Sequence, residues 1–172
     1  AGEERPLEGE VDLNLYMAHG YRVEKYNNEF VVAGLTEGAE DHALMKLDSS
    51  GTKVIWSKAY GGASPDHLFG LDLADNGSIF VTGHTLSGTI NWDTYTLKID
   101  LDGDVAWERK LGNPRGYNEN FIHDEAWGIK ATPDGGAVVV AGTGDEYEQY
   151  SKCNDNPSDC SDVWHVYLLK YD

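Results

Sequence analysis

Three aspartates stand within one five-residue stretch, Asp100-Leu-Asp102-Gly-Asp104. Calcium prefers carboxylate oxygens, and alternating aspartates on a turn bring several of them together. The pattern departs from an EF-hand loop, because its glycine comes two places early and no distal glutamate follows in register. The equivalent stretch Asp48-Ser-Ser-Gly-Thr52 keeps one carboxylate of the three. The stretch therefore predicts either a calcium site formed by Asp100, Asp102 and Asp104 or a plain hairpin turn.

Six histidines are distributed along the chain without the spacing of a zinc motif. They are His19, His42, His67, His84, His123 and His165. Zinc sites commonly draw ligands from short local patterns, so we expect each histidine to be packed or solvated, although ligands from different repeats could converge. His19 and Trp127 occupy matching places in the chain, which indicates a packing position.

Two further carboxylates, Asp66 and Asp124, stand at equivalent positions where strands are expected to begin. Such a pair would suit a cation or acid–base catalysis. An aspartate at the start of a strand more commonly caps a turn through its own side chain, and we expect capping here. The chain carries no nucleophile elbow, phosphate-binding glycine loop or dinucleotide fingerprint. No catalytic or cofactor-binding residue is therefore predicted.

The two cysteines, Cys153 and Cys160, lie in the stretch CNDNPSDC. The intervening asparagine, aspartate, proline and serine residues form turns readily, so the two thiols can meet. A small disulfide is the favoured interpretation, with a pair of reduced thiols as the alternative. A disulfide indicates an oxidising compartment, so we expect a secreted protein, extracellular or periplasmic.

One phrase occurs three times along the chain, as NNEFVVAG, DNGSIFVTG and DGGAVVVAG. When the three phrases are placed in register, four further sets of residues align. These are a glycine upstream of each phrase, the glycine that ends it, a lysine downstream of it and, in two repeats, a tryptophan. The aligned sets are Gly20, Gly70 and Gly128; Gly34, Gly83 and Gly142; Lys46, Lys98 and Lys170; and Trp56 with Trp107. The chain therefore contains three repeats, about 16–62, 63–113 and 114–172, within one domain of residues 1–172.

Each repeat holds four short apolar runs separated by turn residues. Asp-Gly or Asn-Gly between alternating runs is a strong hairpin signal, and no stretch shows helical periodicity. The expected fold class is all-β, as a β-propeller-like array of three four-stranded antiparallel blades. We expect Trp56 and Trp107 to be equivalent core residues packed against the neighbouring repeat.

The repeats resemble those of secreted bacterial and archaeal β-propeller proteins. The resemblance rests on the pattern WSKAYGG…DHLFG…DNGSIFVTG…YTLKID and covers about residues 16–172. It implies blade architecture and is nearly silent on activity. Three blades are fewer than the four to eight that usually close a ring. The last blade is completed either by an N-terminal strand near Glu8–Tyr16 or by a second chain, as in a homodimer; alternatively the chain is a piece of a longer propeller.

The formal net charge is −17, from 30 acidic and 13 basic residues. Such a field repels phosphate backbones, so no nucleic-acid partner is expected, and no apolar run is long enough for a membrane span. We expect a binding or scaffolding module that recognises a protein, a glycan or a cation. A hydrolase, lyase or metal or redox enzyme with a central site, or a processed subunit of a complex, is the alternative.

The third repeat carries an insertion, DEYEQYSKCNDNPSDCSD, before its last strand. Insertions in repeat folds map to loops, often on the binding face. Aromatic residues near the loops could stack on sugar rings. They are Trp92, Tyr147, Tyr150 and Trp164.

Overall fold

The computed structural model describes residues 17–36, 38, 41–144 and 164–172, and these contain eleven strands and no helix. The first sheet holds β1 (His19–Tyr26), β2 (Glu29–Leu35), β3 (His42–Leu47) and β4 (Val54–Tyr60). The second holds β5 (Asp66–Leu73), β6 (Ile79–Thr85), β7 (Asp93–Ile99) and β8 (Val105–Leu111). The third holds β9 (His123–Ala131), β10 (Ala137–Gly144) and β11 (His165–Tyr171). Each repeat thus forms its own sheet.

Neighbouring strands within every sheet are antiparallel and follow one another in chain order. This confirms the all-β prediction and the antiparallel meanders. The hairpin turns depend on glycine where the chain must adopt a positive φ, as at Gly77 (φ 85°) and Gly103 (φ 82°). The third sheet has three strands among the described residues rather than four.

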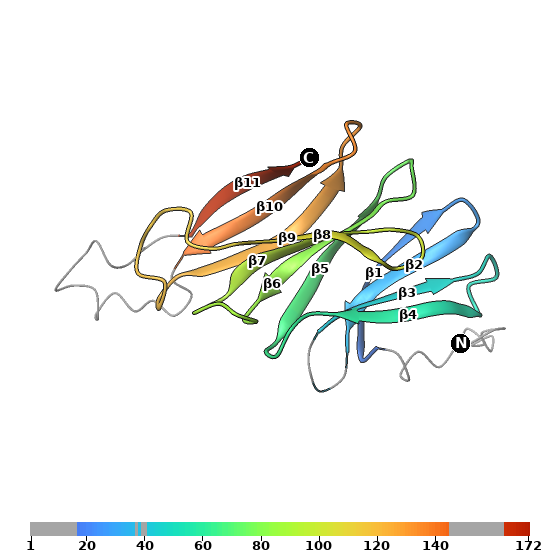
Figure 1. The fold of residues 1–172 in the computed structure, drawn as a ribbon, viewed down its shortest axis with the longest axis horizontal. Helices are drawn as coiled ribbons and strands as arrows, with labels where there is room; N and C mark the ends of the chain where they lie inside the picture. The colour runs from blue at the N-terminus through green and yellow to red at the C-terminus, as the bar shows by residue number, and fades with distance from the viewer. Residues whose placement is uncertain (1–16, 37, 39–40, 145–163) are drawn as a thin grey trace, which may run out of the picture.

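The three sheets stand side by side in an open row rather than in a closed ring (Figure 1). Their first strands lie together, since β5 contacts both β1 and β9. Each sheet therefore meets its neighbour at a junction where side chains from two repeats interleave. We call the contact between the first and second sheets the first junction, and that between the second and third sheets the second junction.

The first junction contains the larger apolar core. Its buried residues are Val31, Ala33, Leu35, Leu44 and Tyr60 from the first sheet and Leu68, Leu71, Ile79, Val81, Tyr95, Leu97 and Ile99 from the second. The second junction contains a smaller cluster built on Ala126, Val139 and Ala141. Strand β6, in the middle sheet, is buried along its whole length because it has a neighbouring sheet on each face.

Both aligned tryptophans contact the next repeat, as predicted, but neither is fully buried. Trp56 packs at the edge of the first-junction core and donates its indole N–H to the Leu101 carbonyl (2.9 Å). Trp107 lies on a largely exposed strand, with its ring centroid 5.6 Å from that of Tyr171. The prediction of equivalent core residues is therefore wrong in its burial, because β4 and β8 are the last strands of their sheets.

The two outward faces of the row differ. The free face of the third sheet exposes Val166 (78%) and Leu168 (68%). On the first sheet a separate cluster forms around Met45, which is buried together with Met17. No helix in the described part of the chain has the length and apolar character needed to cross a membrane.

Candidate functional site

A row of aromatic rings runs across the inner strands of the three sheets. Tyr21, Phe69 and Trp127 stand at the register shifts of β1, β5 and β9, so each repeat places one ring at the equivalent point. Ring centroids lie 4.6 Å apart for Phe69 and Trp127, 5.6 Å for Tyr21 and Phe69, and 6.3 Å for His19 and Tyr21. We call His19, Tyr21, Phe69 and Trp127 the inner aromatic surface.

The inner aromatic surface is accessible to solvent. Half of Trp127 (50%) and more than a third of Tyr21 (37%) are exposed, and His19 is exposed as well. Gly70 allows the strands beneath to approach closely, because a Cβ there would lie 2.9 Å from a methyl of Thr82 and 3.2 Å from one of Ile129. The packing position expected for His19 and Trp127 is thus largely a surface position.

Three histidines and Trp92 continue the rings toward the interior. His67 Nδ1 lies 3.2 Å from His84 Nε2, and the Trp92 ring centroid is 4.7 Å from each of these imidazoles. Burial, followed by the nearby His67, lowers the pKa of His84 to about 3. Burial also lowers the pKa of His42 to about 4, although its Nε2 bonds the His67 carbonyl at 2.8 Å. His42 and His84 are therefore neutral at physiological pH.

These histidines do converge from different strands, yet they do not form a metal-ligand set. Within the described ranges, no group of three or more histidine, cysteine, aspartate or glutamate side chains is arranged to hold a metal ion. The imidazoles of His67 and His84 instead pack against the rings of Phe69 and Trp92.

The predicted calcium stretch forms the hairpin turn between β7 and β8. Asp100 Oδ1 accepts from the backbone N–H of Asp102 (2.9 Å) and Asp104 (2.8 Å). Asp104 Oδ1 pairs with Lys58 Nζ of the first sheet at 2.7 Å. Two of the three carboxylates are thus engaged in the turn and in a contact with the neighbouring repeat. Calcium binding by Asp100, Asp102 and Asp104 stays a prediction.

The same turn docks onto the first sheet through its backbone. Tyr60 donates its hydroxyl to the Gly103 carbonyl (2.8 Å), and Trp56 donates to the Leu101 carbonyl. These two bonds hold the turn against the first sheet.

Asp66 and Asp124 cap loops at the two junctions, as expected. Asp66 is fully buried, and its Oδ2 accepts from the Gly62 N–H (2.7 Å) and the Ser87 hydroxyl (2.8 Å). Asp124 is also buried and accepts from the Asn113 N–H and the Tyr167 hydroxyl. The two carboxylates do not meet each other, because each serves its own junction.

An acidic pocket of about 290 Å³ opens at the second junction. Its lining residues are Ile90, Asn91, Asp93, Gly112, Asn113, Glu119, Ile122 and Asp124. Burial, then the charges of Asp124 and Glu119, raises the pKa of Asp93 to about 6. A carboxyl with a raised pKa beside other carboxylates in a pocket is typical of sites that handle protons or cations.

The sequence analysis missed Asp93 and its counterpart Asp41 in the first repeat. Both stand five places before the repeat lysines Lys98 and Lys46, so their equivalence was visible in the alignment. The sequence alone did not predict that each of them lies close to an aspartate of the following repeat.

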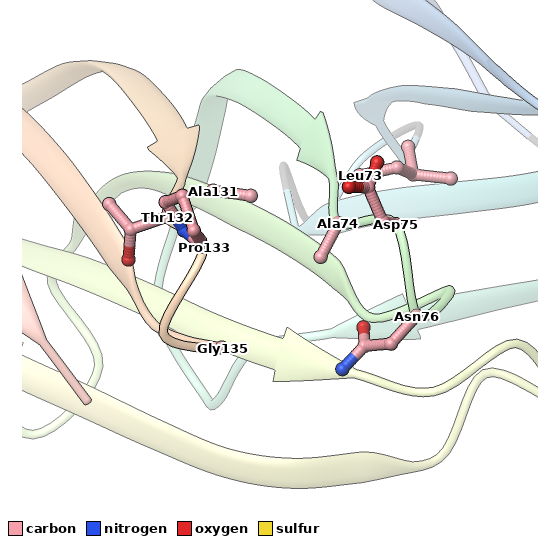
Figure 2. A pocket seen from close by; sticks show the side chains of 8 residues that line it. All are labelled: Leu73, Ala74, Asp75, Asn76, Ala131, Thr132, Pro133 and Gly135. Atoms are coloured by element: carbon pink, nitrogen blue, oxygen red, sulfur yellow. The ribbon is translucent and has the colours of Figure 1, made fainter.

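A second hollow, of about 200 Å³, lies between the β5–β6 turn and the β9–β10 turn (Figure 2). It is lined by Leu73, Ala74, Asp75, Asn76, Ala131, Thr132, Pro133 and Gly135. Asn76 Oδ1 accepts from the Ser78 N–H (3.0 Å), which is ordinary turn chemistry. We assign no reaction to this hollow.

Several predicted features lie outside the described residues. They are Cys153 and Cys160, the insertion with Tyr147 and Tyr150, and the N-terminal segment near Glu8–Tyr16. Trp164, at the border of the insertion, is exposed (39%) and its ring lies against Gly142 and Gly144.

The chain matches no protein-family model and no curated protein. Among solved structures it is similar to a chain of hydrazine synthase from Kuenenia stuttgartiensis, with 15% sequence identity and a TM-score of 0.46. The similarity covers 75% of this chain and 40% of that one.

Proposed function

We propose that the chain is a binding module of the β-propeller type, and that its ligand contacts the inner aromatic surface. One observation supports this above all: rings from three successive repeats lie in contact with one another, and those of Tyr21 and Trp127 stay exposed. Large aromatic groups are normally withdrawn from water, and an exposed group of them marks an interaction site.

The ligand that this surface suits best is a neutral glycan. Aromatic faces offer broad apolar contact, and sugar rings present apolar faces of similar size. The neighbouring imidazoles of His42 and His84 are neutral, and the net charge of −17 disfavours anionic ligands. A protein partner would use the same surface, and a glycan screen distinguishes this alternative from glycan binding.

The test is binding of the full chain to a panel of neutral glycans, measured by affinity electrophoresis and tryptophan fluorescence. We expect Trp127→Ala to weaken binding at least tenfold, because a half-exposed aromatic face of the surface is lost. Ile55→Ala is the matched control, since Ile55 is exposed on β4 away from the inner strands. Equal binding by wild type and Trp127→Ala would contradict the proposal.

The open row of sheets supports a second part of the proposal, which concerns assembly. The free apolar face of the third sheet, with Val166 and Leu168, corresponds to the faces that pack at the two junctions. We propose that the N-terminal segment or a second copy of the chain completes the propeller. Native mass measurement distinguishes the two, since only the second gives a dimer. Secretion and the Cys153–Cys160 disulfide belong to the same proposal and are tested by thiol alkylation of the untreated protein.

An enzymatic function is favoured by one specific observation, the acidic pocket. Asp93, with a pKa raised to about 6, could donate a proton while a neighbouring carboxylate accepts one, which is the division of roles seen in acid–base catalysis. A hydrolysis screen with small glycosides tests this. Turnover that survives Asp93→Asn would dismiss the pocket as its source.

A further inference from the structure

Two carboxylates from different repeats converge at the first junction. Asp41 directly precedes β3 of the first sheet, and Asp66 begins β5 of the second. Between them lies Gly61, which follows β4: a Cβ on this residue would sit 2.5 Å from Asp66 Oδ2 and 2.9 Å from Asp41 Oδ1. The absence of a side chain at Gly61 is therefore what lets the two carboxylates approach.

Two oxygens of this pair are buried without a hydrogen-bond partner. Asp66 Oδ2 is satisfied by Gly62 and Ser87, but Asp66 Oδ1 and Asp41 Oδ1 have no partner. A buried carboxylate oxygen with nothing to accept from is costly, and each such atom in a folded protein calls for an explanation. Burial and the charge of Asp66 both raise the pKa of Asp41, as expected for like charges in a poorly solvated place.

Among the residues that the structure describes, no lysine or arginine pairs with Asp41 or Asp66. Lys110, which lies near this junction, donates to the Ser87 carbonyl (2.6 Å) and stands over the Tyr95 ring. Ser87 in turn donates its hydroxyl to Asp66. The lysine thus supports the loop that holds Asp66 instead of pairing with either carboxylate.

We propose that a divalent cation of the calcium class binds between Asp41 and Asp66 and ties the first repeat to the second. Hard cations take oxygen ligands, and carboxylates, backbone carbonyls and waters together fill their coordination. The ion would satisfy both partnerless oxygens and cancel the like-charge repulsion. Asp41 is only partly buried, so it gives the ion a path from solvent. The net charge of −17 raises the local cation concentration.

The second junction repeats the arrangement and supplies a contrast. Asp93 and Asp124 are the counterparts of Asp41 and Asp66, and a Cβ on Gly112 would overlap the Asp93 carboxylate. There, however, Asp124 accepts from Asn113 and Tyr167, and Asp93 faces the acidic pocket. Among the described residues, the buried carboxylate oxygens without a partner belong to the first junction, so the proposal is made for that junction.

The experiment uses the full chain, stripped with a chelator and then titrated with calcium chloride. Thermal unfolding and calorimetry are compared for wild type, Asp41→Asn and Asp102→Asn. We expect calcium to raise the wild-type Tm in a concentration-dependent way, since a ligand that binds only the folded state stabilises it. Asp41→Asn keeps the shape of the side chain and should weaken calcium binding at least tenfold. Asp102→Asn tests the separate calcium site predicted in the β7–β8 turn, and a response carried by Asp41 and Asp66 should persist in this variant.

Three results would overturn the proposal. Loss of the calcium response in Asp102→Asn but not in Asp41→Asn would place the ion in the turn. Equal stabilisation by calcium, magnesium and sodium at matched ionic strength would indicate general screening. No calcium response in any variant, together with a higher Tm for Asp41→Asn than for wild type in chelator, would show that the carboxyl pair stays metal-free and holds a proton. Circular dichroism confirms that both variants fold.

Discussion

The two junctions are built by equivalent strands of successive repeats, yet their buried side chains differ in polarity. At the first, Val81 and Leu97 of the middle sheet face an aliphatic core. At the second, the opposite face of the same strands presents the buried threonines Thr82, Thr94 and Thr96. Thr82 and Thr96 bond each other through their hydroxyls at 2.8 Å.

This difference separates two roles within one sheet. Apolar burial stabilises in proportion to area, whereas a buried hydroxyl pair contributes little beyond satisfying itself. We therefore expect the first junction to carry most of the stability. The second junction is the more polar of the two, and the acidic pocket opens there.

The largest expected effect tests that separation directly. Leu97→Ala should lower the free energy of unfolding by about 2–5 kcal/mol, because it opens a cavity in a fully buried core. Val139→Ala at the second junction removes less apolar volume and should cost roughly 1–2 kcal/mol. Urea unfolding measures both. Equal losses would mean that the two junctions contribute alike.

A second test uses the glycine that each junction places beside its carboxylates. Gly61→Ala and Gly112→Ala should each destabilise by about 1–3 kcal/mol, since the added methyl group must displace a carboxylate. Gly116→Ala would report only the cost of a positive φ (73°) with open space around it. A neutral Gly61→Ala variant would show that Asp41 and Asp66 are not held where the structure has them.

The sequence predicted the strands well because turn residues and alternating apolar runs are local signals. Asp-Gly and Asn-Gly turns and the repeat lysines placed the hairpins in the right order. The alignment of closing glycines was less accurate. Lys98 pairs with Phe80, three places before Gly83, whereas Lys170 pairs with Val138, four places before Gly142. The third repeat is thus displaced by one residue at that glycine, next to a bulge between Val140 and Ala141.

The candidate sites were predicted less well, because they depend on contacts between repeats. Asp41 and Asp66 are 25 positions apart and belong to different sheets, so no local sequence pattern predicts that they lie close together. The calcium stretch shows the opposite case: its local pattern is conspicuous, yet Asp100 folds back on its own turn. A pattern within one repeat cannot tell what the neighbouring repeat will supply.

A third test uses pH, since titratable groups near the second junction shift in opposite directions. The pKa of Asp93 is raised from 3.8 to about 6, so its stabilising contribution is present below pH 3.8 and is lost as the pH rises through 6. The pKa of His84 is lowered from 6.5 to about 3, so its contribution is present above pH 6.5 and is lost as the pH falls toward 3. Between pH 4 and 6 the two trends oppose each other.

In Asp93→Asn the opposing contribution of the Asp93 carboxyl is removed, so the pH dependence of stability should follow that of His84. Its free energy of unfolding should rise more steeply than that of wild type from pH 4 to pH 6.5. The difference in rise should be roughly 1–2 kcal/mol, allowing for solvent screening of a half-buried carboxyl. Chemical denaturation across this range measures it. A parallel pair of pH profiles would show that the carboxyl titrates normally and that the acidic pocket holds no strained group.

The smallest expected effect concerns the exposed margin of the first junction. Lys58 Nζ and Asp104 Oδ1 lie 2.7 Å apart, but both side chains are in contact with water, Asp104 strongly so. An exposed ion pair contributes about 0.2–1 kcal/mol and weakens as salt is added. A double-mutant cycle with Lys58→Met and Asp104→Asn should give a coupling energy in that range, falling in 1 M sodium chloride. A larger, salt-resistant coupling would mean that the β7–β8 turn is held to the first sheet mainly by charge. The small value expected here instead assigns the docking to the buried hydroxyl of Tyr60 and the indole of Trp56, which bond the backbone of the turn and keep the apolar core of the first junction closed.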